Sequence, residues 1–318
     1  MIMGLICFPC ETQAEKIRVI LDSDANNELD DQHAIAYTLF NGNDFDVEGI
    51  TVNRTRNGGN VEQHFKEADR VVKLCGLDQK ITVYRGANGS FDEIKGHVTE
   101  SMFDGVDAVD FIIERSRATS RRKLVLLPIG KLTNIALALH KDPSIASKVR
   151  IVWLGSNYPA PGEYNQDNDI PSLNYILDTN VDFEIALVRY GKPSGTDAVR
   201  ASLSEIKTKM PGLGPRIADP VVGRHGKAFS TFGDYSVDLF NNMGHESRAM
   251  FDMAAVAIVK NPSWARPSRI PSPKLVEGKW VERPENPRKI TLWENFDKVE
   301  IMKDFYRSME NYVLVETQ

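Results

Sequence analysis

The chain has 318 residues, of which 42% are hydrophobic and 26% are charged, a composition typical of soluble globular proteins. Its formal net charge of −5 argues against a surface that binds nucleic acid or an anionic membrane. No apolar run reaches about 18 residues, so no membrane span is expected, and the length suffices for one α/β domain or two smaller ones.

Residues 1–16 precede the first recognisable element. Cys7 and Cys10 form a C-x-x-C pair there, which without a second pair is a weak indication of a zinc or redox site. No positively charged region comes before the short apolar stretch, and this disfavours a signal peptide. We interpret the segment as a flexible tail or remnant signal and expect a cytoplasmic protein, with export through a short signal as the alternative.

From Ile17 onward, β-like and helix-like segments alternate. Short apolar or β-branched runs predict strands at 17–21, 47–52, 81–84, 124–127, 149–154 and 182–188. Apolar residues at helical spacing predict helices near 34–39 and at 61–74, 105–116 and 134–139. The alternation predicts an α/β domain over residues 17–262, with a Rossmann-like, open, mostly parallel sheet and helices on both faces.

The pattern changes after Pro262. Prolines punctuate short β-like pieces at 274–281 and 289–293, and an amphipathic helix follows, with Ile301, Phe305 and Met309 on one side. We expect residues 263–318 to form a C-terminal β and helix appendage packed on the same domain, or a subunit contact.

An acidic loop follows the first predicted strand. Asp22, Asp24, Asp30 and Asp31 lie within ten residues of one another, at the carboxyl end of the strand, where ligands bind in open parallel sheets. Clustered carboxylates repel each other unless a cation neutralises them, and oxygen ligands alone suit calcium or magnesium. Helix capping by Asp30 or Asp31 is the alternative, but it does not explain Asp22 and Asp24.

Three later loops add candidate ligands. Thr133 ends the run Gly130-Lys131-Leu132-Thr133, where a backbone carbonyl could ligate a cation or the side chain could cap a helix. Asn157, Glu163 and Asn165 follow the predicted strand at 149–154; they have the groups that sugar hydroxyls need, or they form an ordinary surface loop. Asp252 opens an apolar helix that runs to about Val259.

Together these stretches resemble the inosine-uridine preferring nucleoside hydrolase family. The family's first loop is usually D-x-D-P-G-x-D-D, and here it reads Asp22-Ser23-Asp24-Ala25-Asn26-Asn27-Glu28-Leu29-Asp30-Asp31, two residues longer. Leu126 to Asn134 is similar to the family's L-x-P-L-G-P-L-T-N element, and Asn157, Glu163, Asn165 and Asp169 reproduce the spacing of a third element.

The resemblance implies a calcium site, a sugar site and a base site. Calcium would be held by Asp24, Asp31, Asp252 and the Thr133 carbonyl. Asp22 would support these ligands without touching the metal. Substrate would be bound by Asp30, Asn60, Asn157, Glu163, Asn165 and Phe251, the last stacking on the nucleobase. Asp24 would be the general base that takes a proton from a metal-bound water.

The implied activity is calcium-dependent hydrolysis of the N-glycosidic bond of purine or pyrimidine ribonucleosides to ribose and free base. Phe251 stands where pyrimidine-tolerant members often have a histidine that protonates the leaving group. A ribosyl-ligand binding protein, or a hydrolase of a modified ribosyl compound, is therefore one alternative. A magnesium-dependent phosphohydrolase of the dehalogenase type, which also places D-x-D after a first strand, is another. The partner we expect is a small-molecule nucleoside, in a homo-oligomer, either dimer or tetramer.

Overall fold

The structure is a computed structural model and describes residues 15–316. The predicted tail and its C-x-x-C pair lie almost entirely outside the described residues. Within 15–316, no helix is both long and apolar enough to cross a membrane.

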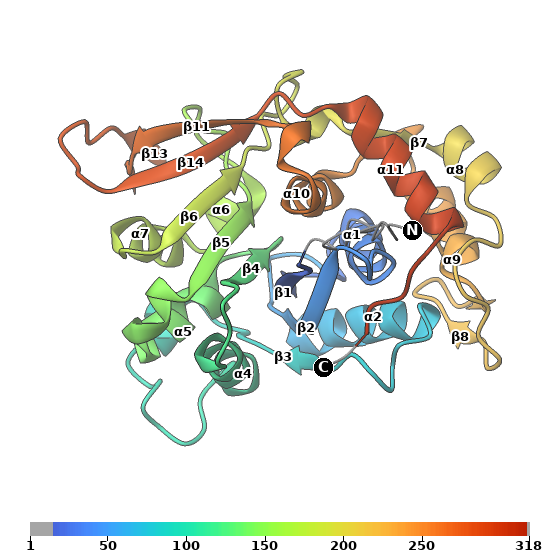
Figure 1. The fold of residues 1–318 in the computed structure, drawn as a ribbon, viewed down its shortest axis with the longest axis horizontal. Helices are drawn as coiled ribbons and strands as arrows, with labels where there is room; N and C mark the ends of the chain where they lie inside the picture. Colours follow the sequence, from blue (N-terminus) through green and yellow to red (C-terminus); the bar gives the residue numbers. More distant parts are fainter. Residues whose placement is uncertain (1–14, 317–318) are drawn as a thin grey trace, which may run out of the picture.

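An eight-stranded sheet forms the centre of the molecule, in the strand order β11-β14-β6-β5-β4-β1-β2-β3 (Figure 1). Its strands are β1 (Ile17–Ser23), β2 (Phe45–Val52), β3 (Val83–Arg85), β4 (Leu124–Pro128), β5 (Val149–Leu154), β6 (Asp182–Ala186), β11 (Arg266–Pro271) and β14 (Lys289–Glu294). All neighbouring pairs are parallel except β11 with β14, which confirms the predicted mostly parallel sheet.

Helices cover both faces of the sheet, as predicted (Figure 1). One face carries α1 (Asp30–Leu39), α2 (Val61–Leu74), α10 (Phe251–Lys260) and α11 (Lys298–Glu310), and the other carries α4 (Val106–Arg117), α5 (Thr133–Lys141) and α7 (Ile170–Asp178). Successive strand side chains point to opposite faces, so Val19 and Leu21 join one hydrophobic core and Ile20 joins the other. This two-sided burial explains why the strand sequence is continuously apolar.

Shorter elements lie around this core. The short helices are α3 (Phe91–Ile94), α6 (Tyr164–Asn168), α8 (Leu203–Lys209) and α9 (Phe232–Asn241). Three small antiparallel pairs are β7 (Arg200–Ser202) with β10 (Ser247–Ala249), β8 (Val221–Val222) with β9 (Ala228–Phe229), and β12 (Lys274–Val276) with β13 (Lys279–Val281).

The C-terminal segment is more closely integrated than the expected appendage. Strand β14 pairs in parallel with β6 and extends the central sheet, while Ile301, Phe305 and Met309 of α11 enter the core beneath α1. Strand β11 was not predicted from the sequence, because Pro267 and Pro271 argue against a strand. Strand β11 is at the sheet edge, where a proline is tolerated because one side of the strand needs no hydrogen-bond partner.

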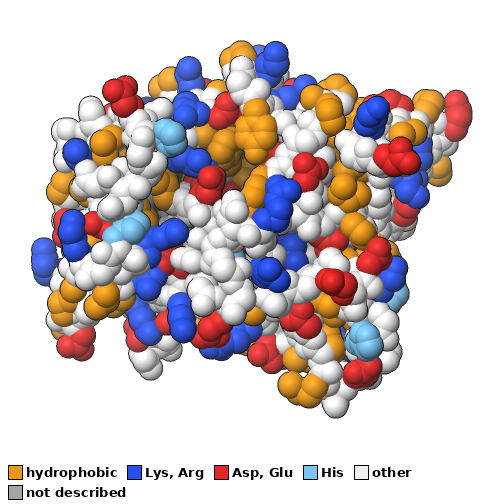
Figure 2. Space-filling model, turned by 180° about the vertical axis from the view of Figure 1, so that it is seen from behind, with side chains coloured by type: hydrophobic (Ala, Val, Ile, Leu, Met, Phe, Trp, Pro, Cys, Tyr) orange, Lys and Arg blue, Asp and Glu red, His pale blue; other side chains and the backbone are white. Residues whose placement is uncertain are grey.

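The surface carries both signs of charge. Figure 2 shows acidic and basic side chains interspersed over the face opposite to that of Figure 1, with hydrophobic side chains visible in its upper middle part. This distribution agrees with the small net charge of −5 and offers no single-sign field on this face.

Candidate active site

The candidate site lies where β1 adjoins both β2 and β4. The chain leaves β1 toward β2 on one side, and β4 flanks β1 on the other, so the carboxyl ends of the strands border a crevice at this point. A pocket opens there with about 350 Å³ of free space, including the part open to solvent. Its walls are formed by Asp24, Asn27, Glu28, Asp30, Asp31, Ile129, Leu154, Glu163, Tyr164, Asn165, Val188, Tyr190, Phe251 and Asp252.

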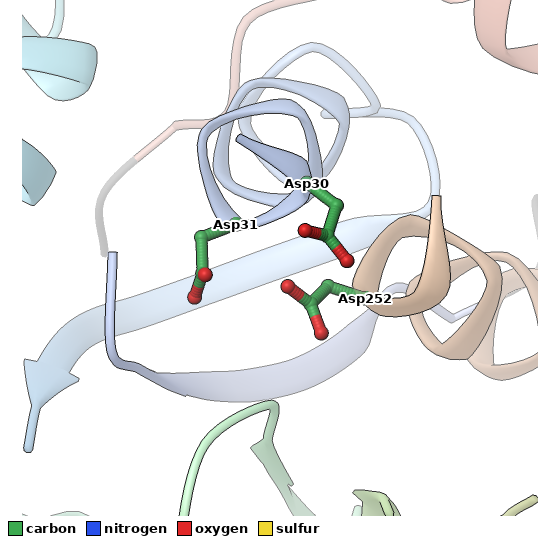
Figure 3. Close-up of side chains that lie close together, drawn as sticks. All are labelled: Asp30, Asp31 and Asp252. Carbon is green, nitrogen blue, oxygen red and sulfur yellow. The ribbon is translucent and has the colours of Figure 1, made fainter. Parts of the chain in front are cut away.

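Three aspartates form the floor of this pocket. Asp30 and Asp31 come from the first turn of α1, and Asp252 from the first turn of α10. Each offers a carboxylate oxygen, and these oxygens lie within 4.8 Å of one another (Figure 3). All three residues are buried, and an all-oxygen ligand set of this kind suits a hard divalent cation.

Asp24 is the fourth carboxylate and lies in the loop between β1 and α1. Its Oδ2 accepts a hydrogen bond of 2.5 Å from Thr55 Oγ1, which fixes the side chain. Ser23 Oγ donates to Asp31 Oδ1 at 2.7 Å and orients that side chain in the same way. The neighbouring residues therefore hold the carboxylates in place before any ligand arrives.

The pKa values of the cluster show how strongly burial disfavours its charges. Burial raises the pKa of Asp24 to about 7, and the charges of Asp22 and Glu163 add to this effect. Burial also raises the pKa of Asp30 to about 7, with the charge of Asp24 contributing. For Asp31 and Asp252, burial and then repulsion by the neighbouring carboxylates raise the pKa well above the ordinary value. A bound cation would favour the charged forms, so the donor set fits a metal.

These shifts predict how the stability of the metal-free protein depends on pH. Because the folded-state pKa values of Asp24 and Asp30 lie near 7 instead of 3.8, the native state holds protons that the unfolded state releases. Stability is therefore lost as the pH rises through the window from about 4 to 7. We expect the melting temperature of dialysed, metal-free protein to fall between pH 5 and 8, measured by calorimetry. The slope should be shallower in Asp30→Asn, and an equal slope in both proteins would contradict the prediction.

Asp22 lies beneath the pocket and does not line it. Its carboxylate accepts hydrogen bonds from Thr51 Oγ1 at 2.6 Å, Asn134 Nδ2 at 2.7 Å and Asn53 Nδ2 at 3.0 Å. Burial raises its pKa to about 6, and the three hydrogen bonds oppose this shift. Asp22 thus ties β1 to β2 and α5, and its support of a bound metal stays a prediction.

Asn134 is the centre of that network. Its Nδ2 donates to Asp22 and, at 3.0 Å, to the carbonyl of Val52, while its Oδ1 accepts from the N–H of Ala87 at 2.8 Å. Asn134→Ala would remove these three buried hydrogen bonds, although Asp22 would keep those from Thr51 and Asn53, and we expect it to lower the free energy of unfolding by about 3 kcal/mol, measured in urea.

A matched control is the exposed Asn241, the last residue of α9. Asn241→Ala should change the free energy of unfolding by no more than about 0.5 kcal/mol. If both variants lost the same small amount, the Asn134 network would have no special role in stability.

Thr133 is the first residue of α5, and its Oγ1 donates to Asp169 Oδ2. The N-cap position belongs to Leu132, so Thr133 does not cap the helix. Asp169 also accepts from the N–H of Phe91 at 2.8 Å, so the two side chains join three loops around the site. Ligation by the Thr133 carbonyl stays a prediction.

Glu163, the N-cap of α6, and Asn165, in the first turn of α6, line the pocket. The Glu163 carboxylate accepts from the N–H groups of Ser156, Gln166 and Asn165 at 2.9, 2.9 and 3.1 Å. The amide nitrogen of Asn165 donates to the carbonyls of Ile129 at 2.8 Å and Leu154 at 3.2 Å. These contacts leave the amide oxygen of Asn165 without a partner in the described chain, as an acceptor for a ligand hydroxyl.

Two residues assigned to the sugar site lie elsewhere. Asn60 is exposed and is the N-cap of α2, where its side chain accepts from the N–H of Glu62 at 3.0 Å. Asn157 does not line the pocket; its Oδ1 accepts from the N–H of Tyr190 at 3.0 Å and its Nδ2 donates to the Gly162 carbonyl. Local capping and loop hydrogen bonds already use these side chains, and their contact with a sugar stays a prediction.

Three aromatic residues form the remaining wall. The rings of Phe251 and Tyr190 meet edge to face, with centroids 5.9 Å apart and an interplanar angle of 89°. Tyr164 lines the same pocket, and its hydroxyl accepts from the N–H of Asn57 at 2.9 Å. Phe251 is the residue expected from the sequence to stack on a nucleobase, whereas neither tyrosine was expected at the pocket. Tyr164 lies inside the Glu163–Asn165 motif, which was the available signal.

Arg248 was also missed. Its guanidinium forms an ion pair with Glu28, approaches Asp30 Oδ1 to 3.5 Å, and lies over the Phe251 ring at 5.6 Å. The positive charge of Arg248 therefore borders both the acidic cluster and the aromatic wall. No sequence pattern indicated this position for Arg248.

Comparison with known proteins identifies the family. The family model described as inosine-uridine preferring nucleoside hydrolase matches residues 19–309, which is most of the chain. The chain belongs to this family. The prediction of an N-glycosyl hydrolase is confirmed by this membership, which also argues against the dehalogenase-type phosphohydrolase.

Individual nucleoside hydrolases resemble the chain at low identity over most of its length. The pyrimidine-specific ribonucleoside hydrolase RihB of Escherichia coli is 28% identical over an alignment of 267 residues that covers 78% of this chain and 80% of RihB. The inosine-uridine preferring nucleoside hydrolase of Leishmania major is 24% identical over an alignment of 272 residues that covers 80% of this chain and 82% of that protein. The structure of a purine-preferring ribonucleoside hydrolase from Gardnerella vaginalis aligns with a TM-score of 0.71 at 20% identity, covering 92% of this chain and 98% of that one.

Proposed function

We propose that this nucleoside hydrolase family member cleaves the N-glycosidic bond of ribonucleosides to give ribose and free base, in a calcium-dependent reaction. The observation that carries the proposal is the buried cluster of Asp24, Asp30, Asp31 and Asp252 at the floor of a pocket with an aromatic wall. A carboxylate floor suits a cation and a sugar, and an aromatic wall suits a base.

Calcium would be held by Asp24, Asp31, Asp252 and the Thr133 carbonyl. When bound, the cation lowers the pKa of a coordinated water and provides coordination sites for vicinal hydroxyls. Asp22 supports this arrangement through its hydrogen bonds to Thr51, Asn53 and Asn134.

The protein's own groups would carry the other steps. Asp24 accepts the proton of the attacking water, since its carboxylate opens to the pocket and its Oδ2 is already oriented by Thr55. As the bond to the base lengthens, the sugar gains positive charge, which the surrounding carboxylates stabilise. Asn165 and Glu163 hold the sugar, and Phe251, Tyr164 and Tyr190 pack against the base.

Phe251 favours a second candidate, a hydrolase of a modified ribosyl compound or a ribosyl-ligand binding protein. A phenyl ring cannot donate a proton, so a base that needs protonation to leave would have to receive it from another group. The homo-oligomer and the cytoplasmic location stay predictions.

The test is release of free ribose from a panel of purine and pyrimidine nucleosides, with calcium and then with a chelator. Release that depends on calcium would support the main proposal and give the base preference. Tight calcium binding without release from any nucleoside would favour the modified ribosyl compound or the binding role.

A further inference from the structure

A second cavity adjoins the candidate site, and two arginines and two histidines are among its lining residues. It has about 610 Å³ of free space, including the part open to solvent, and it shares Asn27 and Glu28 with the pocket described above. Arg224, His225, His245 and Arg248 line it, and Glu28 is its one acidic lining residue among the described residues. We call this cavity the cationic annex.

The arginines of the cationic annex are incompletely paired. Arg224 donates from Nη2 to the carbonyl of Asn26 at 3.2 Å and forms no ion pair with any carboxylate in residues 15–316. Arg248 pairs with Glu28, but its Nε is buried and has no hydrogen-bond partner within the described chain. Arg248 also lies 3.5 Å from Asp30 Oδ1, so the charge that lacks a carboxylate partner in residues 15–316 is that of Arg224, and an anionic ligand would neutralise it.

His225 also offers a polar atom to a ligand in the cationic annex. His225 Nδ1 lies 2.8 Å from Oδ2 of Asp238, a buried carboxylate that also pairs with Lys227 at 3.2 Å. This contact orients the ring and leaves Nε2 as a donor or acceptor toward a ligand. Asp238 is balanced by its own two partners, and it is not among the lining residues of the cationic annex.

The position of the cationic annex indicates which part of a ribosyl compound it would meet. Arg248 lies over the ring of Phe251, the residue proposed to contact the base. The carboxylate of Glu163 lines the main pocket beside Asn165, where the sugar is proposed to bind, and it would repel a phosphate on the sugar. An anionic group is therefore better placed on the base than on the ribose.

We propose that the preferred substrates are ribosides whose base carries a negative charge and leaves as an anion stabilised by Arg224 and Arg248. This inference rests on the proposed function and names its substrate class. In the step, the bond between the anomeric carbon and the base nitrogen breaks and its electron pair stays on the nitrogen. The water oxygen bonds to the anomeric carbon, its proton goes to Asp24, and solvent later protonates the nitrogen. Fixed positive charge thus takes the place of the acid that Phe251 cannot supply.

The test compares orotidine with uridine, because the two differ by one carboxylate on the base. We expect kcat/KM for orotidine to exceed that for uridine by about tenfold or more, and Arg224→Gln to bring the ratio close to one. Arg121→Gln is the matched control: Arg121 is exposed and precedes β4, at the end of the sheet opposite the site, so the ratio should stay as in wild type. Uridine 5′-monophosphate, which carries its negative charge on the ribose and not on the base, tests the alternative position.

Three results would overturn the proposal: a uridine rate equal to or above the orotidine rate, an unchanged ratio in Arg224→Gln, or a preference for the 5′-monophosphate. Binding of free orotate and uracil, measured by calorimetry with calcium present, keeps the test independent of turnover. If no nucleoside is hydrolysed but orotate binds and Arg224→Gln abolishes its binding, the proposed hydrolysis fails and the anion site stands. If orotate binds no better than uracil, the anion site fails, whatever the hydrolysis result.

Discussion

Asp24→Asn should lower kcat for nucleoside hydrolysis by about 10³-fold, because the amide cannot accept the proton of the attacking water. Asparagine has nearly the same shape as aspartate, and Thr55 can still donate to its side-chain oxygen, so the fold should be kept. The measurement is ribose release from the best nucleoside of the panel, together with calcium binding by calorimetry.

The matched control is Asp110→Asn, which removes a carboxylate from the exposed side of α4, where Asp110 pairs with Lys141 at 2.5 Å. Its kcat should stay within twofold of wild type, roughly the range expected when only a surface ion pair is lost. A wild-type kcat in Asp24→Asn would show that another group takes the proton, and the proposed role of Asp24 would be abandoned.

The second large effect concerns stabilisation by calcium. In wild type, calcium at about a hundred times its dissociation constant should raise the free energy of unfolding by about 2.7 kcal/mol, and Asp252→Asn should remove most of this increment. The same variant should be at least as stable as wild type without metal. Repulsion from Asp30, Asp31 and Asp24 contributes to the raised pKa of Asp252, and the amide is free of that repulsion.

Asp304→Asn gives the opposite pattern and serves as the control. Asp304 is also buried, but it is balanced by Lys260 at 2.6 Å and by Tyr37 and Arg307. Losing this carboxylate should destabilise the protein with and without calcium, while the calcium increment stays intact. If Asp252→Asn lost stability without metal and kept its calcium increment, the cluster would not be a calcium site.

Much of the fold could be predicted because local pattern and burial agree. The strand at 149–154 and the helix at 61–74 have the predicted bounds, since apolar runs buried on both sides and amphipathic spacing leave little choice. The continuation of the sheet through β14 and β11 could not be predicted in this way. Which strand pairs with β6 is decided by tertiary contacts more than 100 residues apart, such as Leu292 with Ile185.

In the candidate site too, residues with a local sequence signal were predictable and residues placed by tertiary contacts were not. The grouping of Asp24, Asp30, Asp31 and Asp252 was predictable because helix capping explains at most one acidic residue per helix start and leaves several like charges to be neutralised. The hydrogen bonds of Asn60 and Asn157 could not be predicted, because an asparagine side chain serves caps, loops and ligands equally well, and only the structure shows which backbone groups lie within reach. Tyr190 and Arg248 come from segments remote in sequence, so only folding brings them to the pocket.

The place of β14 in the sheet also affects how the chain folds during synthesis. Strand β6 pairs with β5 on one side and with Thr291 to Trp293 of β14 on the other. About a hundred residues must therefore be synthesised after β6 before its second edge is covered. Until then the nascent chain exposes an open parallel edge that could pair with another chain. A ribosome-bound intermediate that ends near residue 265 should therefore bind chaperones more strongly than one that extends past α11.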